Sequence, residues 1–249
     1  MHVSLKLLLL AIIAFAISIA VITVASTDRS LNSQGNSSNN RQHVTDLERW
    51  PIADFDATLP VDPANRAKRQ AKNKKYDKSD WPIVVNDVAD STVRLHKLNP
   101  ELPAFPARES RVILIGRIAS AAAYLSNDKT GVYSEFTIVV EEVLKNDLVG
   151  QLVAASSVVV SREGGRIRFP SGRIHWYGIG RQRMPCIGGR YVLFLSGETE
   201  ETLNILTGYE LDSGKVTPLD DLNNPNQYRN ADEVIFMRNL KESLTSSLK

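Results

Sequence analysis

An unbroken apolar run from Leu7 to Ala25 limits how the rest of this 249-residue chain can fold. Only Ser18 and Thr23 dilute its Leu, Ile, Ala, Val and Phe residues. At the rise of an α-helix, these 19 residues nearly span the hydrocarbon core of a bilayer. We therefore predict that residues 1–25 form a signal anchor, with a membrane-spanning helix over residues 7–25.

A cleaved signal peptide is the alternative for the same residues. Lys6 provides positive charge before the run, and Thr23-Val24-Ala25 is a small-residue cleavage site ahead of Ser26. The positive charge also places the N-terminus inside the cell. The chain is therefore predicted to be membrane-anchored with its C-terminal domain extracytoplasmic, or exported after cleavage near Ala25.

Two polar segments separate the apolar run from the rest of the chain. Residues 26–49 are predicted to be a disordered linker, because stretches such as SLNSQGNSSNN cannot bury a core. Residues 50–109 are rich in proline and contain a basic run, Arg66–Lys78. This run is either an adhesive patch for phospholipid head groups, anionic polysaccharide or nucleic acid, or a solvated helix or linker. The second interpretation is favoured because the run lacks the interleaved aromatic pattern of a nucleic-acid surface.

Aromatic residues in residues 50–109 indicate that this segment is partly packed on a folded domain. We expect these contacts at Trp50, Phe55 and Trp81.

Short runs of β-branched residues, separated by turn residues, begin near Arg111. The clearest is Val132–Leu144, in which alternate positions from Val132 to Val140 predict one buried face. The predicted strands are Val112–Leu125, Val132–Leu144, Leu152–Ser161, Ile167–Phe169, Arg173–Ile179, Arg190–Ser196, Leu203–Leu211 and Lys215–Leu219. Strands at this spacing predict a small antiparallel barrel, closed or partly open, over residues 110–222.

An amphipathic helix is predicted over residues 230–248. Its expected apolar side carries Val234, Ile235, Met237, Leu240 and Leu244. The lone Cys186 cannot form an internal disulfide, so the fold must depend on its core. The predicted fold class is mainly β: an OB-like barrel with a C-terminal helix, preceded by a transmembrane helix and a polar linker.

Residue patterns for catalysis are missing from the sequence. The histidines are scattered, and no paired Cys and His spacing predicts a zinc site. Phosphate-binding loops and nucleophile elbows are also absent. We therefore predict no enzyme, no metal and no small-molecule cofactor. The alternative is an unrecognised hydrolase or redox enzyme that uses Cys186 with His175, or a carboxylate.

One arginine-rich region has the composition of a ligand surface. The candidate ligand-binding residues are Arg162, Arg166, Arg168, Arg173, Trp176, Arg181 and Arg183. Arginines beside aromatic residues on adjacent strands can bind an anionic polymer, a glycan or a protein partner. Alternatively, their stems cover apolar strands and their charges pair with acids such as Glu198, Glu200 and Glu201.

Several motifs between Ser110 and Asp221 resemble an uncharacterised exported bacterial family with an OB-like or TIMP/netrin-like barrel. The motifs are KTGVYSEF at Lys129–Phe136, VEEVLK at Val140–Lys145, REGG at Arg162–Gly165 and RYVLFL at Arg190–Leu195. The resemblance implies a barrel and an envelope setting, and it brings no catalytic residues. TIMP-like modules depend on cysteine bridges that this chain lacks, so a protease-inhibitor role is not supported. The predicted function is a non-enzymatic, membrane-anchored envelope module.

Overall fold

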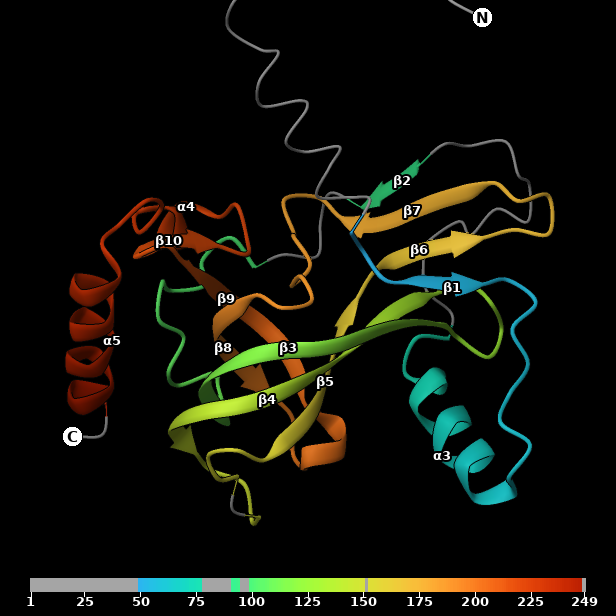
Figure 1. Cartoon of the computed structure of the whole chain (residues 1–249), viewed down its shortest axis with the longest axis horizontal. Helices are drawn as coiled ribbons and strands as arrows, with labels where there is room; N and C mark the ends of the chain where they lie inside the picture. Colours follow the sequence, from blue (N-terminus) through green and yellow to red (C-terminus); the bar gives the residue numbers. More distant parts are fainter. Residues whose placement is uncertain (1–48, 78–90, 95–98, 151, 248–249) are drawn as a thin grey trace, which may run out of the picture. The chain divides into compact units, whose positions relative to one another are not determined.

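The computed structural model describes residues 49–77, 91–94, 99–150 and 152–247 (Figure 1). The helices are α3 (Pro63–Lys74), η1 (Glu200–Thr202), α4 (Asn223–Asn226) and α5 (Glu233–Ser247). The strands are β1 (Ile52–Asp54), β2 (Ser91–Arg94), β3 (Val112–Leu125), β4 (Val132–Asn146), β5 (Ser157–Glu163), β6 (Gly165–Arg168), β7 (Ile174–Ile179), β8 (Arg190–Ser196), β9 (Asn204–Asp212) and β10 (Lys215–Pro218). The protein is therefore mainly β, with a C-terminal helix.

The predicted membrane span and the linker lie outside the described residues. Among the residues that are described, no helix is both long and apolar enough to cross a bilayer.

Six strands form a ring-like sheet in the order β10-β9-β5-β4-β3-β8. The ring arises because β8 pairs with β3 on one side and with β9 on the other. The long β3–β4 hairpin contributes most of the pairing, and its register shifts at three places, one of them between Ile115 and Gly116. A Cβ at Gly116 would lie 2.7 Å from the Val139 carbonyl oxygen, so only glycine fits where β3 approaches β4 this closely.

The inner face of the ring is the main hydrophobic core. The predicted alternation in β4 is confirmed, because Val132, Ser134, Phe136, Ile138 and Val140 are all buried. Phe136, Ile138 and Val140 pack in the main core with other strands of the ring, whereas Val132 packs with Ile167 and Tyr177 of the second sheet. This burial of apolar surface is the main driving force for folding. The predicted strand from Leu152 starts later than expected, at Ser157.

The prediction that all the strands join one barrel is wrong for β6 and β7. These strands form a second sheet with the order β1-β6-β7-β2. Gly164 has a φ of +108°, which lets the chain leave β5 and turn into β6. The predicted packing of Trp50 and Phe55 is confirmed: Trp50 is buried, and Phe55 stacks on Phe169 with ring centroids 5.2 Å apart. Trp81 lies outside the described residues.

Helix α5 is present as predicted, but the prediction of its apolar side is partly wrong. Phe236 and Leu240 are fully buried, whereas Val234 and Ile235 are 78% and 50% exposed. Phe236 packs against Tyr209 and Tyr228, with ring centroids 4.7 and 5.3 Å away. The side of α5 that is buried is therefore the one that faces Tyr209 of β9 and Tyr228.

Candidate anion-binding groove

Helix α3 forms from the proline-rich, basic part of the chain. Asp62 caps its N-terminus, because the carboxylate accepts a hydrogen bond of 2.8 Å from the backbone N–H of Asn65. Pro63 occupies the first turn, where the missing N–H costs nothing. Lys72 and Lys74 lie in the last turn, where the helix dipole favours positive charge. These local interactions stabilise both ends of α3.

An ion-paired contact attaches α3 to the outer face of β4. The Arg69 guanidinium donates to both carboxylate oxygens of Glu135, at 2.9 and 3.0 Å. It also donates to the Tyr133 hydroxyl at 2.9 Å and lies 3.5 Å from the centroid of the Tyr124 ring. Lys72 reaches the same Glu135 carboxylate at 3.1 Å. Because two cations meet one acid, the contact leaves a surplus of positive charge beside β4.

Tyrosines complete this attachment. Tyr76 stacks on Tyr133 with ring centroids 4.1 Å apart, and the Tyr133 hydroxyl donates to Asn73 at 2.8 Å. Burial raises the pKa of Tyr133 to about 12 and raises the pKa of Tyr76 as well. Burial is the largest single effect on Arg69 and lowers its pKa, but the hydrogen bonds and charge interactions with Glu135 and Tyr133 together outweigh it, so the pKa lies above its ordinary value. The phenols therefore stay protonated and Arg69 stays charged at physiological pH.

A groove of about 570 Å³ lies between α3 and η1. Its lining residues are Pro60, Asn65, Lys68, Arg69, Ala71, Lys72, Lys75, Glu201 and Thr202. The α3 side therefore supplies four cations, and the η1 side supplies a single carboxylate. The side chains of Lys68 and Lys75 are exposed, and neither makes an ion pair or a hydrogen bond with a described residue. Such a concave, positively charged surface can attract and hold an anion.

The lysines of the groove share one side of the helix. Lys68, Lys72 and Lys75 have the spacing i, i+4, i+7, which places them along one helix face. At the α-helical rise, successive lysines are about 6 and 4.5 Å apart along the axis. Lysine is a compact point charge on a flexible stem, so the row can adapt to a ligand with several negative charges.

The predicted arginine patch is only partly assembled. Arg166 pairs in register with Trp176 across β6 and β7, and Arg168 lies on the same side of the sheet as Arg166. Arg173 follows in the turn between these strands. The Arg168 side chain lies 3.2 Å from the Asp54 carboxylate, and Arg166 donates to the Trp50 carbonyl oxygen at 2.7 Å. Two of these arginines thus have structural contacts with the segment around β1.

Arg181 and Arg183 lie in the loop that follows β7. The Arg181 carbonyl oxygen accepts from the backbone N–H of Asp221, and the backbone N–H of Arg183 donates to Leu219. The backbone of both residues therefore joins this loop to the segment that follows β10.

The prediction that Arg162 belongs to a ligand surface is wrong. Its side chain is buried and pairs with Asp220, which has no exposed surface. Burial lowers the pKa of Arg162 and raises the pKa of Asp220, and the attraction between the two charges opposes both shifts. Arg162 therefore belongs to the interior. Arg162 pairs with Asp220 and Arg168 with Asp54, rather than with the predicted group at Glu198, Glu200 and Glu201.

Cys186 and His175 occupy different surroundings. His175 is buried on β7 and packs on Phe169, with ring centroids 4.8 Å apart. Cys186 is half-buried in the loop before β8, where its backbone N–H donates to the Tyr191 hydroxyl at 2.9 Å. Across the described residues, no group of three or more His, Cys, Asp and Glu side chains could hold a metal ion.

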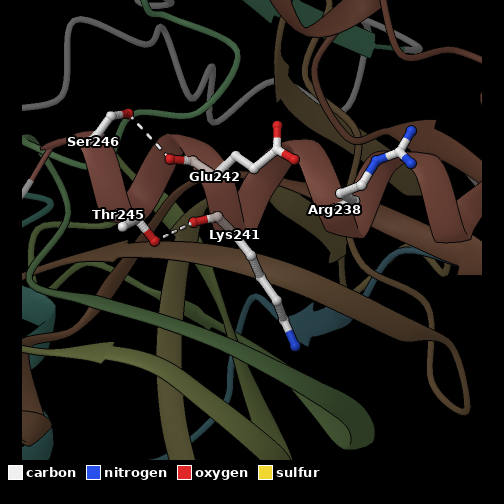
Figure 2. A pocket seen from close by; sticks show the side chains of 5 residues that line it. All are labelled: Arg238, Lys241, Glu242, Thr245 and Ser246. Atoms are coloured by element: carbon white, nitrogen blue, oxygen red, sulfur yellow. Dashed lines mark hydrogen bonds between the residues drawn. The ribbon is translucent and has the colours of Figure 1, made fainter.

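A second hollow, of about 640 Å³, lies along α5 and is lined by Arg238, Lys241, Glu242, Thr245 and Ser246 (Figure 2). The hydroxyls of Thr245 and Ser246 donate to backbone carbonyls of their own helix, at 2.9 and 3.1 Å. Lys241 pairs with Glu142 at 3.1 Å. The described lining residues all come from α5, and Lys241, Thr245 and Ser246 already have partners. This hollow is therefore a weaker candidate for ligand binding than the groove.

The cations of the groove belong to the Arg66–Lys78 run, for which the solvated helix or linker is the favoured interpretation from the sequence. A local signal was present, because Asp62-Pro63 followed by cations at helical spacing predicts the start of a helix. The contact with Glu135 and the proximity of η1 carry no such signal, because they join segments distant in the sequence. Comparisons with known proteins add no assignment, since no family model and no curated protein matches the chain.

Proposed function

We propose that this protein is a non-enzymatic module of the bacterial cell envelope that binds an anionic partner through the groove between α3 and η1. Residues 7–25 hold it at the membrane, or direct its export if cleavage occurs near Ala25. The ring-like sheet is an OB-like barrel that acts as the scaffold, and α3 is the binding element.

The observation that carries this proposal is the excess of cations in the groove. Lys68, Lys72 and Lys75 share one helix face, and Arg69 holds that face against β4 through Glu135. Arg69, Lys72 and the stacking of Tyr76 on Tyr133 attach α3 to β4. The side-chain charges of Lys68 and Lys75 take no part in this attachment, so they are available to a ligand.

Neutralising the groove is expected to weaken the binding of a linear polyanion. The full chain in neutral detergent would be titrated into a labelled polyanion, with fluorescence anisotropy as the readout over a range of salt concentrations. Lys68→Gln with Lys75→Gln should weaken binding at low salt by about 10-fold or more, at about 1 kcal/mol per cation. The salt dependence should also flatten, because fewer counterions are released.

The control variant, Lys74→Gln with Lys215→Gln, removes the same total charge from exposed positions outside the groove. It should retain nearly all of the parent's affinity. Equal losses of affinity in the two variants would show that the overall charge of the protein, and not the groove, determines binding. A third variant, Arg168→Gln with Arg173→Gln, tests the β6–β7 surface, and a larger loss there would move the site to that sheet. If the parent binds no polyanion at low salt, the proposed function is wrong.

The proposed location has a separate test. A reporter that is active only outside the cytoplasm, fused after Lys249, should be active, because Lys6 precedes the apolar run and keeps the N-terminus inside. Membrane fractionation then separates the alternatives: a retained anchor pellets with membranes, and a cleaved product that begins near Ser26 stays soluble. If a reporter that is active only in the cytoplasm were active at this position instead, the predicted orientation would be wrong.

A further inference from the structure

The two walls of the groove differ in chemistry, and this difference narrows the class of ligand. The α3 wall presents Lys68, Lys72 and Lys75, whereas the η1 wall presents Glu201. Glu201 is exposed and makes no ion pair with a described residue, so its carboxylate is available to the groove. An anion that carried charge on every side would be repelled by Glu201 while it was attracted by the lysines.

Neutral polar groups suit the remaining surface. The Asn65 side chain can donate and accept hydrogen bonds, and the Glu201 carboxylate can accept from a hydroxyl group. The Thr202 hydroxyl is already engaged, because it accepts from the backbone N–H of Thr199 at 3.0 Å and donates to the Thr199 carbonyl oxygen at 3.0 Å. Asn65 and Glu201 therefore remain to contact hydroxyl groups between the charges of a ligand.

The lining also disfavours two other classes of ligand. Among the described residues, the lining includes no aromatic ring on which a nucleobase could stack, and base stacking is a main source of affinity for single-stranded nucleic acids. The apolar residues of this described lining are Pro60 and Ala71, which are too few to bury an acyl chain.

We infer that the groove binds a linear polymer in which phosphate groups alternate with hydroxyl-bearing units, as in a polyol phosphate. This inference rests on the proposed function and specifies its ligand. Phosphates of the polymer face the lysines of α3, and the intervening hydroxyl groups face Glu201 and Asn65.

The test compares polymers with matched phosphate content, using the full chain in neutral detergent. Poly(glycerol phosphate) should bind more tightly than inorganic polyphosphate at equal phosphate concentration, by about 3- to 10-fold. Glu201→Gln should reduce this preference by improving polyphosphate binding, because it removes the repulsion without a new charge. The matched control is Glu200→Gln, an exposed neighbour that does not line the groove, and it should keep the preference.

Each alternative outcome has its own meaning. Equal binding of both polymers, or the same effect of Glu201→Gln and Glu200→Gln, overturns the ligand assignment but leaves anion binding intact. Tighter binding of an oligothymidylate than of poly(glycerol phosphate) also overturns it, in favour of nucleic acid. If none of the polymers binds at low salt, the proposed function itself fails.

Discussion

Replacing Asp220 with alanine is expected to lower the free energy of unfolding by about 3–5 kcal/mol. The carboxylate is fully buried and is the ion-pair partner of Arg162, whose side chain is also buried. Removing the acid would leave a guanidinium charge in the interior without compensation, and such a charge costs far more than a lost surface contact. Urea unfolding monitored by circular dichroism would measure the change.

A double replacement separates the cost of an uncompensated charge from the value of the ion pair. Arg162→Met with Asp220→Leu keeps similar volume and removes both charges, so its stability should lie within about 1 kcal/mol of the parent. Nε and Nη1 of Arg162 and Oδ2 of Asp220 have no hydrogen-bond partner among the described residues. The pair is therefore incompletely satisfied and provides little net stability over an apolar substitute.

The neighbouring acid provides the matched control for this position. Asp221 is exposed and contacts Arg229 at 3.1 Å, so Asp221→Ala should cost less than about 1 kcal/mol. A loss of less than about 1 kcal/mol for Asp220→Ala would contradict the buried pair. A loss for the double variant as large as for Asp220→Ala would show that the ion pair itself stabilises the fold.

Phe236→Ala is expected to lower the free energy of unfolding by about 3–5 kcal/mol, because it leaves a cavity in a filled aromatic cluster. The ring is fully buried against Tyr209, Tyr228 and Phe105, the last with ring centroids 5.5 Å apart. Because α5 is attached through this residue and Leu240, its amides should also exchange with solvent faster than in the parent.

Val234→Ala is the matched control on the same helix. Val234 is 78% exposed, so its truncation should change stability by less than about 0.5 kcal/mol. If Val234→Ala were the more damaging change, α5 would pack on the side predicted from the sequence. Chemical denaturation measures both variants, and hydrogen exchange locates the loss within the chain.

The candidate site was only partly predictable from the sequence. The Arg66–Lys78 run was identified as basic, and its binding to anions was one of two interpretations. The groove depends on Glu135 of β4 and Glu201 of η1, which lie far along the chain from α3. Local patterns carry no information about which distant acid a cation meets, so the groove itself could not be predicted from the sequence.

The arginine-rich region is the reverse case, because the sequence predicts one shared surface and the structure separates its residues. Arg162 and Arg168 look alike in the sequence, yet Arg162 pairs with Asp220 in the interior and Arg168 lies exposed near Asp54. Gly164 causes this difference, because its positive φ turns the chain out of β5 and into the second sheet. Composition alone could not separate residues on the two sides of this turn.

The sequence by itself determined the strands in which apolar residues at alternate positions form one buried face. It also determined that a C-terminal helix is present. In β4, the inner positions are buried as the period-two pattern requires. Tertiary structure alone decided the other face, where Tyr133 and Glu135 are buried under α3 while Val139 and Glu141 remain exposed. The reason is that periodicity records which residues share a face, whereas burial depends on the distant segment that covers it.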